Sequence, residues 1–213
     1  MPTPETLATV FAASLMLAIT PGPDNLFVLT QAALRGAAAG LMVVLGLCTG
    51  LILHTSLVAF GVAAIFQTSE LAFSLLKYLG AAYLIYLAWG AFRAGAAELD
   101  GQGVESHGLG AMYRRGIVMN VTNPKVSIFF LAFLPQFADT ERGSLAAQIF
   151  VFAGAFLLAT LLVFGGVAIA AGKLGAWLRE RPGVQRGMNR MAALVLFGLA
   201  VGLLISQAPM DKS

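Results

Sequence analysis

Long apolar stretches dominate the pattern along the chain, and charged residues are gathered in the short segments between them. Five runs contain no Asp, Glu, Lys or Arg, at residues 6–23, 36–69, 78–92, 143–172 and 191–210. Several of these runs reach about 20 residues, which is the length of helix that crosses a bilayer. The pattern therefore predicts an all-α integral membrane protein.

The runs and their flanking residues predict six membrane-spanning helices, at about residues 6–34, 37–65, 71–92, 114–137, 144–172 and 189–207. With their connections these spans occupy nearly all of the 213 residues, so we expect no separate soluble catalytic domain. The first run has no basic segment before it and leads directly into Pro21 and Asp24. We therefore interpret it as the first span and not as a cleaved signal peptide.

Composition and charge exclude several other classes of protein. Hydrophobic residues make up 59% of the chain and charged residues only 11%, whereas soluble domains contain about 25% charged residues. The net charge of +3 comes from basic residues that are spread over short connections, so we expect no nucleic-acid partner. Cys48 is the single cysteine, so the chain can form no internal disulfide and no cysteine-based metal site. We expect no cofactor.

The distribution of Lys and Arg between the two sides predicts the orientation in the membrane, because basic loops stay on the cytoplasmic side. One side carries only Arg142 and Lys212. The other side carries nine basic residues, namely Arg35, Arg93, Arg114, Arg115, Lys173, Arg179, Arg181, Arg186 and Arg190. We therefore expect both termini to lie outside the cytoplasm.

Weak internal similarity predicts two copies of a three-helix unit. Residues 57–65 and 161–169 share five identities in nine positions at an offset of 104. The segments 22–24 (Gly-Pro-Asp) and 123–125 (Asn-Pro-Lys) interrupt the first and fourth spans at an offset of 101. Chance matches between segments rich in Ala, Leu, Gly and Val are the alternative explanation. Because three spans is an odd number, two copies would have inverted topologies.

This symmetry divides the chain into a first three-helix repeat at residues 1–93, a cytoplasmic linker at residues 94–112 and a second repeat at residues 113–213. The expected linker is the longest polar stretch and contains five glycines and three acidic residues. Such a composition is typical of a flexible connection.

Prolines inside the first and fourth spans predict broken helices. Pro21, Pro23 and Pro124 lack a backbone N–H and clash with the preceding turn, so a helix cannot continue through them undisturbed. In each span a capping residue, Gly22 or Asn123, precedes a proline that is suited to the first position of a new helix. Two helices would thus begin inside the membrane, and the free N–H groups at their N-termini would favour binding of an anion such as a carboxylate.

Asp24 and Lys125 follow these prolines directly, and we expect them to share a depth near the membrane midplane. Asp24 lies 11 residues before Arg35, and Lys125 lies 10 residues after Arg115. At about 1.5 Å per residue, both are roughly 15 Å from the cytoplasmic boundary. An unpaired charge at that depth costs at least about 2.5 kcal/mol, so the two residues should pair. The pair is either a permanent clamp or one that opens to exchange a proton or a substrate carboxylate.

Other polar residues in the spans are weaker candidates. Asn25, Asn120, Thr122 and Ser127 either bind a polar ligand or bond to a neighbouring helix or to their own backbone. His54, the only histidine within a span, either relays protons or is a packed, neutral histidine, and we expect the latter. Zinc-type ligand spacings and phosphate-binding glycine loops are missing from the sequence, so we expect neither a metal site nor an enzyme.

The two interrupted spans resemble a known family. Residues 19–25 (Ile-Thr-Pro-Gly-Pro-Asp-Asn), residues 123–125 and the phenylalanine-rich residues 129–137 are similar to motifs of the LysE/RhtB family of bacterial amino-acid exporters, of the lysine exporter or homoserine-threonine efflux type. The resemblance covers essentially the whole chain. It implies export of neutral or basic amino acids across the bacterial inner membrane, driven by the proton-motive force. Carried over to this sequence, the site for substrate and proton consists of Pro21, Gly22, Pro23, Asp24, Asn25, Asn123, Pro124 and Lys125.

We therefore expect a secondary transporter in which two inverted repeats rock around a site near the midplane. Its partners would be an amino-acid substrate, protons and the lipid bilayer, and the small-residue helix faces are compatible with a homodimer. Asp24 would either hold the amino group of the substrate or carry the coupling proton. The alternatives are a non-transport membrane protein, such as an intramembrane enzyme or an assembly factor, and a passive channel.

Overall fold

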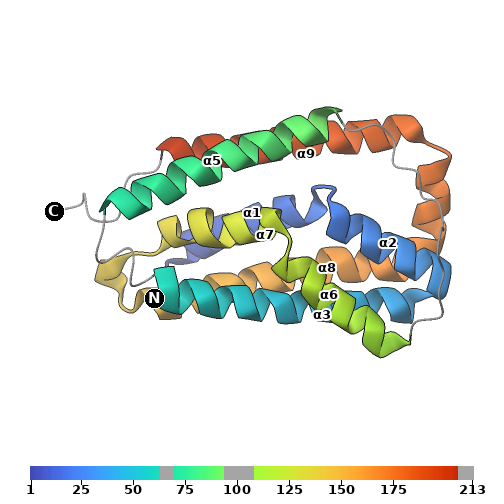
Figure 1. The fold of residues 1–213 in the computed structure, drawn as a ribbon, viewed down its shortest axis with the longest axis horizontal. Helices are drawn as coiled ribbons and strands as arrows, with labels where there is room; N and C mark the ends of the chain where they lie inside the picture. Colours follow the sequence, from blue (N-terminus) through green and yellow to red (C-terminus); the bar gives the residue numbers. More distant parts are fainter. Residues whose placement is uncertain (63–69, 94–107, 206–213) are drawn as a thin grey trace.

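The computed structural model describes residues 1–62, 70–93 and 108–205. Within these ranges the chain is helical and contains no strand, as the apolar pattern predicts (Figure 1). The α-helices are α1 (Pro4–Ile19), α2 (Pro23–Arg35), α3 (Ala37–Leu57), α5 (Glu70–Arg93), α6 (Leu109–Val121), α7 (Pro124–Ile128), α8 (Leu145–Arg179) and α9 (Pro182–Ile205). Short turns of π-helix or 3-10 helix lie between some of them, namely η1 (Val58–Val62), η2 (Phe129–Phe133), η3 (Leu134–Phe137) and η4 (Thr140–Arg142).

The helix breaks expected from the prolines are both present. α1 and α2 are bent by 60° relative to each other, and α6 is bent by 49° relative to the segment Pro124–Phe137. Pro21 and Pro23 cannot donate to the last carbonyl groups of α1, so the first helix ends there. Each new helix begins with a proline directly after its N-cap residue, Gly22 or Asn123. The local chemistry of the proline motifs is therefore sufficient to explain where the chain bends.

Five of the six expected spans have counterparts among the candidate spans of the structure. In the described part of the chain, three helices are long and apolar enough to cross a membrane, or five if each bent pair forms one span. The remaining expected span, residues 71–92, coincides with α5, which is not among these five described candidates. Six spans arranged as two repeats therefore stay a prediction.

Two expected connections differ from the structure. The expected span at residues 144–172 agrees with the candidate span Leu145–Ala171, but the connection after it is mostly helical, because α8 continues to Arg179 and α9 begins at Pro182. A polar segment continues a helix when its residues are good helix formers, and a proline in the first turn of α9 needs no N–H partner. Of the linker expected at residues 94–112, residues 94–107 lie outside the described residues, whereas residues 109–112 already belong to α6.

The helices pack in close pairs, with α3 along α6, α5 along α9, and α8 against both α1 and α2 (Figure 1). Glycines bring the backbones of α3 and α6 into contact. A Cβ atom on Gly46 would lie 2.1 Å from the carbonyl oxygen of Tyr113, and one on Gly116 would lie 2.3 Å from that of Val43. No real side chain tolerates such distances, so these two helices form one closely packed unit.

Phenylalanine rings fill the core between the second broken helix and α8. The rings of Phe129 and Phe133 stack with their centroids 4.9 Å apart. Phe156 of α8 lies 5.1 Å from Phe129 and 5.2 Å from Phe130, measured between ring centroids. These ring contacts fix α8 against the segment that carries Lys125.

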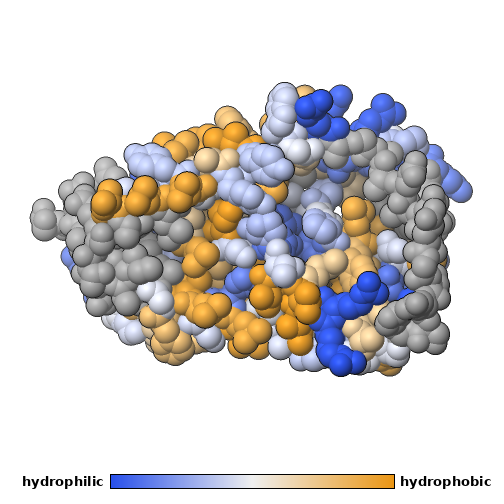
Figure 2. Space-filling view, viewed as in Figure 1, coloured by the Kyte–Doolittle hydropathy of each residue, from blue (hydrophilic) through white to orange (hydrophobic). Residues whose placement is uncertain are grey.

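Large apolar side chains also cover much of the outer surface. Leu57, Phe60 and Ile169, for example, are 69%, 71% and 72% exposed. Figure 2 shows apolar residues over much of the left-hand and central parts of one face, with some hydrophilic residues among them at the centre and groups of strongly hydrophilic residues in the right-hand half. Apolar surface on this scale is unfavourable in water but suits a protein surrounded by lipid.

Candidate functional site

A buried ion pair joins the two broken helices. The Oδ1 atom of Asp24 and the Nζ atom of Lys125 lie 3.6 Å apart, and their side chains are 3% and 7% exposed. Both residues occupy the second position of a helix, Asp24 in α2 and Lys125 in α7. The Asp24 carboxylate lies at a positive helix end, which stabilises it, and it compensates the lysine, whose charge opposes the dipole of α7.

The end of α1 supplies the remaining partners of the lysine. Lys125 Nζ donates to the carbonyl oxygens of Thr20 at 3.2 Å and Leu17 at 3.4 Å. In a continuous helix the Leu17 carbonyl would accept the N–H of the residue four positions later, but this residue is Pro21. The proline that breaks the helix therefore creates the acceptor that Lys125 uses.

Asparagines satisfy other backbone groups at the two breaks. The side-chain amide of Asn25 donates to the carbonyl oxygen of Ala18 at 2.8 Å. The side-chain oxygen of Asn123 accepts the backbone N–H of Lys125 at 3.0 Å, which caps α7. A Cβ atom on Gly22 would lie 2.8 Å from Asp24 Oδ1 and 2.9 Å from Lys125 Nζ, so a glycine leaves space for the ion pair.

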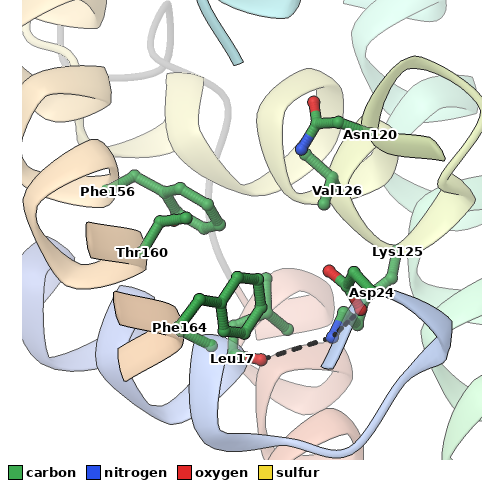
Figure 3. A pocket seen from close by; sticks show the side chains of 9 residues that line it. Leu17, Asp24, Asn120, Lys125, Val126, Phe156, Thr160 and Phe164 are labelled. Carbon is green, nitrogen blue, oxygen red and sulfur yellow. Dashed lines mark hydrogen bonds and ion pairs between the residues drawn. The ribbon is translucent and has the colours of Figure 1, made fainter. Parts of the chain in front are cut away.

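A narrow cavity lies directly beside the ion pair. Figure 3 shows side chains of α8 on one side, and Asp24, Asn120, Lys125 and Val126 on the other. The cavity is lined by Leu17, Ala18, Asp24, Asn120, Lys125, Val126, Phe156, Thr160 and Phe164. Its free space is about that of one water molecule, so a larger ligand requires the surrounding helices to move apart.

The comparison with known proteins identifies the family. Residues 15–207 match the family model described as LysE type translocator. The chain belongs to this family. The translocator is 32% identical over 196 residues to a homoserine/homoserine lactone efflux protein of Salmonella typhimurium strain LT2, with 92% of this chain and 93% of the relative covered. The protein of the same name from Salmonella typhi is 33% identical over 199 residues, with the same shares covered.

A further relative has no assigned activity in its name. The translocator is 31% identical over 193 residues to an uncharacterized membrane protein of Pseudomonas aeruginosa, with 87% of this chain and 88% of the relative covered. No solved structure matches the chain. The family assignment and the apolar helices together make the protein a membrane transporter, and transporters are not a class of enzyme.

The structure brings only part of the predicted site together at the cavity. Asp24 and Lys125 line it, whereas the other six predicted residues shape or cap the breaks around it. Pro23 and Pro124 are exposed, and Pro21 is half-buried between α1 and α2. In the translocator these prolines therefore act on the backbone and not through contact with the cavity.

Three cavity residues on α8 were not anticipated from the sequence. Phe156, Thr160 and Phe164 are spaced four residues apart, so they lie along one face of the helix. Their only signal in the sequence is a threonine between two phenylalanines in an otherwise apolar span. Asn120, which was among the weaker candidates, also lines the cavity.

His54 is packed against the broken helix, as expected. Its side chain is 8% exposed, and its ring lies 6.1 Å from that of Phe130, measured between centroids. The Nε2 atom lies 3.2 Å from the backbone carbonyl oxygen of Asn120, which can only accept a hydrogen bond, so Nε2 is the donor. Among the described residues, no group of three or more His, Cys, Asp or Glu side chains could hold a metal ion.

Proposed function

We propose that the translocator is a secondary exporter of amino acids and that the Asp24–Lys125 pair is its substrate and proton site. The observation that carries this proposal is a buried ion pair that lies between two broken helices and beside a cavity. Ionisable residues inside a membrane protein typically mark substrate or proton pathways. The names of the two Salmonella relatives, which describe efflux of homoserine and its lactone, support the same activity.

The ion pair suits a zwitterionic substrate. In a low-dielectric interior, opening the pair leaves two uncompensated charges, which is unfavourable. An amino acid provides a carboxylate for Lys125 and an ammonium group for Asp24, so it can replace both partners at once. A proton on Asp24 removes one charge of the pair and likewise makes opening easier. Substrate and proton would thereby both shift the equilibrium between the closed and the open ion pair toward the open form.

The packing of the helices supports transport by two inverted repeats at residues 1–93 and 113–213. In chain order, α1 of the first repeat corresponds to α6 of the second, and α3 corresponds to α8. The contact of α1 with α8 therefore corresponds to the contact of α6 with α3, and both contacts occur. The two breaks also occupy equivalent places, because α2 and α7 both begin at a proline that precedes a charged residue. Rocking of one repeat against the other would open the cavity to each side of the membrane in turn.

We further propose that the protein lies in the bacterial inner membrane, with both termini outside the cytoplasm. Two of the basic residues assigned to the cytoplasmic side lie over tryptophan rings. Arg93 is 5.7 Å from the ring centroid of Trp89, and Arg181 is 5.1 Å from that of Trp177. Such Arg and Trp pairs suit the interface between lipid and cytoplasm.

Efflux measurements test the function and the site together. Cells are preloaded with labelled amino acids from dipeptides, and wild type is compared with Lys125→Ala, with and without a protonophore. The proposal predicts efflux from wild type that the protonophore reduces at least about tenfold, because it removes the proton gradient that drives export. Lys125→Ala should reduce efflux by a similar factor, because the substrate carboxylate loses its cation. The control Lys77→Ala removes a lysine of α5 that does not line the cavity and should leave efflux unchanged.

Each part of the proposal has its own contrary result. Export of no amino acid by a wild-type protein that is verified in the membrane would contradict the function. Normal efflux by Lys125→Ala would contradict the site. Efflux that the protonophore does not change would contradict only the coupling to protons and would leave the function and the site standing.

A further inference from the structure

The cavity contains a hydroxyl group that its own helix leaves free. Four Ser or Thr side chains are buried in the described part of the chain: Ser14, Thr20, Thr55 and Thr160. The first three donate to the backbone carbonyl four residues earlier, at 2.6, 2.7 and 2.7 Å. This is the usual way in which a helix satisfies such a group. The Thr160 hydroxyl makes no hydrogen bond to any described residue, although its side chain lines the cavity.

A second polar group reaches the cavity from the opposite side. Asn120 is 3% exposed, and its Oδ1 atom is buried without a hydrogen-bond partner among the described residues. A Cβ atom on Gly50 would lie 2.6 Å from Asn120 Cβ and 2.7 Å from Oδ1, so α3 holds this side chain closely. Figure 3 shows the Asn120 amide on the side of the cavity that faces Thr160 and α8. The Asn120 side chain is thus held in place before any ligand enters.

Apolar side chains surround the two polar groups. Phe156 and Phe164 lie one helical turn to either side of Thr160, and Val126 lies on the same side as Asn120. Apart from Asp24 and Lys125, no acidic or basic residue is among the described residues that line the cavity. A substrate whose amino and carboxylate groups occupy the ion pair therefore meets no further charge, but it does meet a hydroxyl and an amide.

We propose that Thr160, assisted by Asn120, is the specificity-determining residue of the transport site and binds a polar, uncharged group on the substrate side chain. This inference rests on the proposed amino-acid export. A substrate hydroxyl donates a hydrogen bond to the Thr160 oxygen and accepts one from the Asn120 side-chain amide nitrogen, which Figure 3 shows directed toward the cavity. An apolar side chain of the same size leaves both buried groups unsatisfied, which is how a hydrogen-bonding site rejects an analogue that lacks the group.

A pair of substrates that differ by one hydroxyl tests the proposal. Homoserine and norvaline have side chains of equal length, which end in a hydroxyl and a methyl group, respectively. The ratio of their efflux rates is measured for wild type, Thr160→Val and Thr160→Ser. Because valine keeps the shape of threonine and removes only the hydroxyl, Thr160→Val should lower the homoserine-to-norvaline ratio about tenfold, the effect of one hydrogen bond. Thr160→Ser, which keeps the hydroxyl, should retain the wild-type ratio.

The matched control is Thr55→Val, which removes a buried hydroxyl that bonds its own helix. It should leave the ratio unchanged. An unchanged ratio in Thr160→Val, or an equal loss of both activities, would overturn the assignment of Thr160. Export of only charged amino acids by wild type would also overturn it and leave the proposed function standing. Failure of wild type to export any amino acid would overturn both.

Discussion

At the scale of single residues, the two charges of the site depend on each other for their stability. Lys125 has Asp24 and two backbone carbonyls as partners, and both side chains are more than nine-tenths buried. Replacing one member of a buried pair leaves the other charge uncompensated, whereas replacing both members removes the problem. Stability and transport can therefore be separated by comparing single and double substitutions.

Lys125→Met is expected to lower the free energy of unfolding by about 3 to 5 kcal/mol, because it leaves the Asp24 carboxylate buried without a cation. The double variant Asp24→Leu/Lys125→Met should recover most of this loss but should not transport. Denaturant unfolding in detergent and efflux assays on the same proteins check the two statements. A double variant that is stable and transports at the wild-type rate would show that the pair is only a structural clamp.

Asp24→Asn tests the role of the carboxyl group as a proton carrier. Asparagine keeps the size of the side chain but cannot bind and release a proton near neutral pH. If Asp24 carries the proton, this variant loses efflux driven by a proton gradient but retains counterflow exchange, which needs no net proton movement. Proteoliposomes allow both to be measured, with Asp139→Asn at the partly exposed N-cap of η4 as the control. Loss of both activities would instead assign Asp24 to binding of the amino group.

At the scale of helices, the α3–α6 unit should be sensitive to the smallest possible increase in side-chain size. Gly46→Ala places a Cβ atom 2.1 Å from the Tyr113 carbonyl oxygen, so the helices must separate. Overpacking of this kind costs about 1 to 3 kcal/mol. Thermal unfolding in detergent should show a lower midpoint for this variant. Gly154→Ala in α8, where the added Cβ atom meets nothing within 4 Å, should unfold like wild type.

The sequence predicts those structural features that are caused by residues close together in the chain or by the membrane itself. The breaks before Pro23 and Pro124 were predictable because the effect of a proline on its own helix needs no knowledge of the rest of the fold. The pairing of Asp24 with Lys125 was predictable because the membrane makes an isolated charge unfavourable.

The sequence does not predict features of the structure that depend on packing between distant segments or on where the membrane ends. The face of α8 that carries Thr160 was not predictable, because a helix that is apolar on all sides gives no sign of which side meets a cavity. The end of α8 at Arg179 was missed for a related reason: the apolar run ends at residue 172, but the helix does not.

At the scale of the whole molecule, the proposed inverted repeats require one specific arrangement in the membrane. Two three-span units in opposite orientations place the two termini of the chain on the same side, and the distribution of basic residues predicts that this side is outside the cytoplasm. Reporter fusions test both statements, using alkaline phosphatase, which is active outside the cytoplasm, and a fluorescent protein, which is active inside. A fusion after Gly36, between α2 and α3, should report the cytoplasm, whereas fusions after Gly143 and Ser213 should report the outside. A cytoplasmic signal at Ser213 together with an outside signal at Gly143 would imply an odd number of spans after Gly143 and would contradict the inverted repeat, even if the amino-acid export itself were observed.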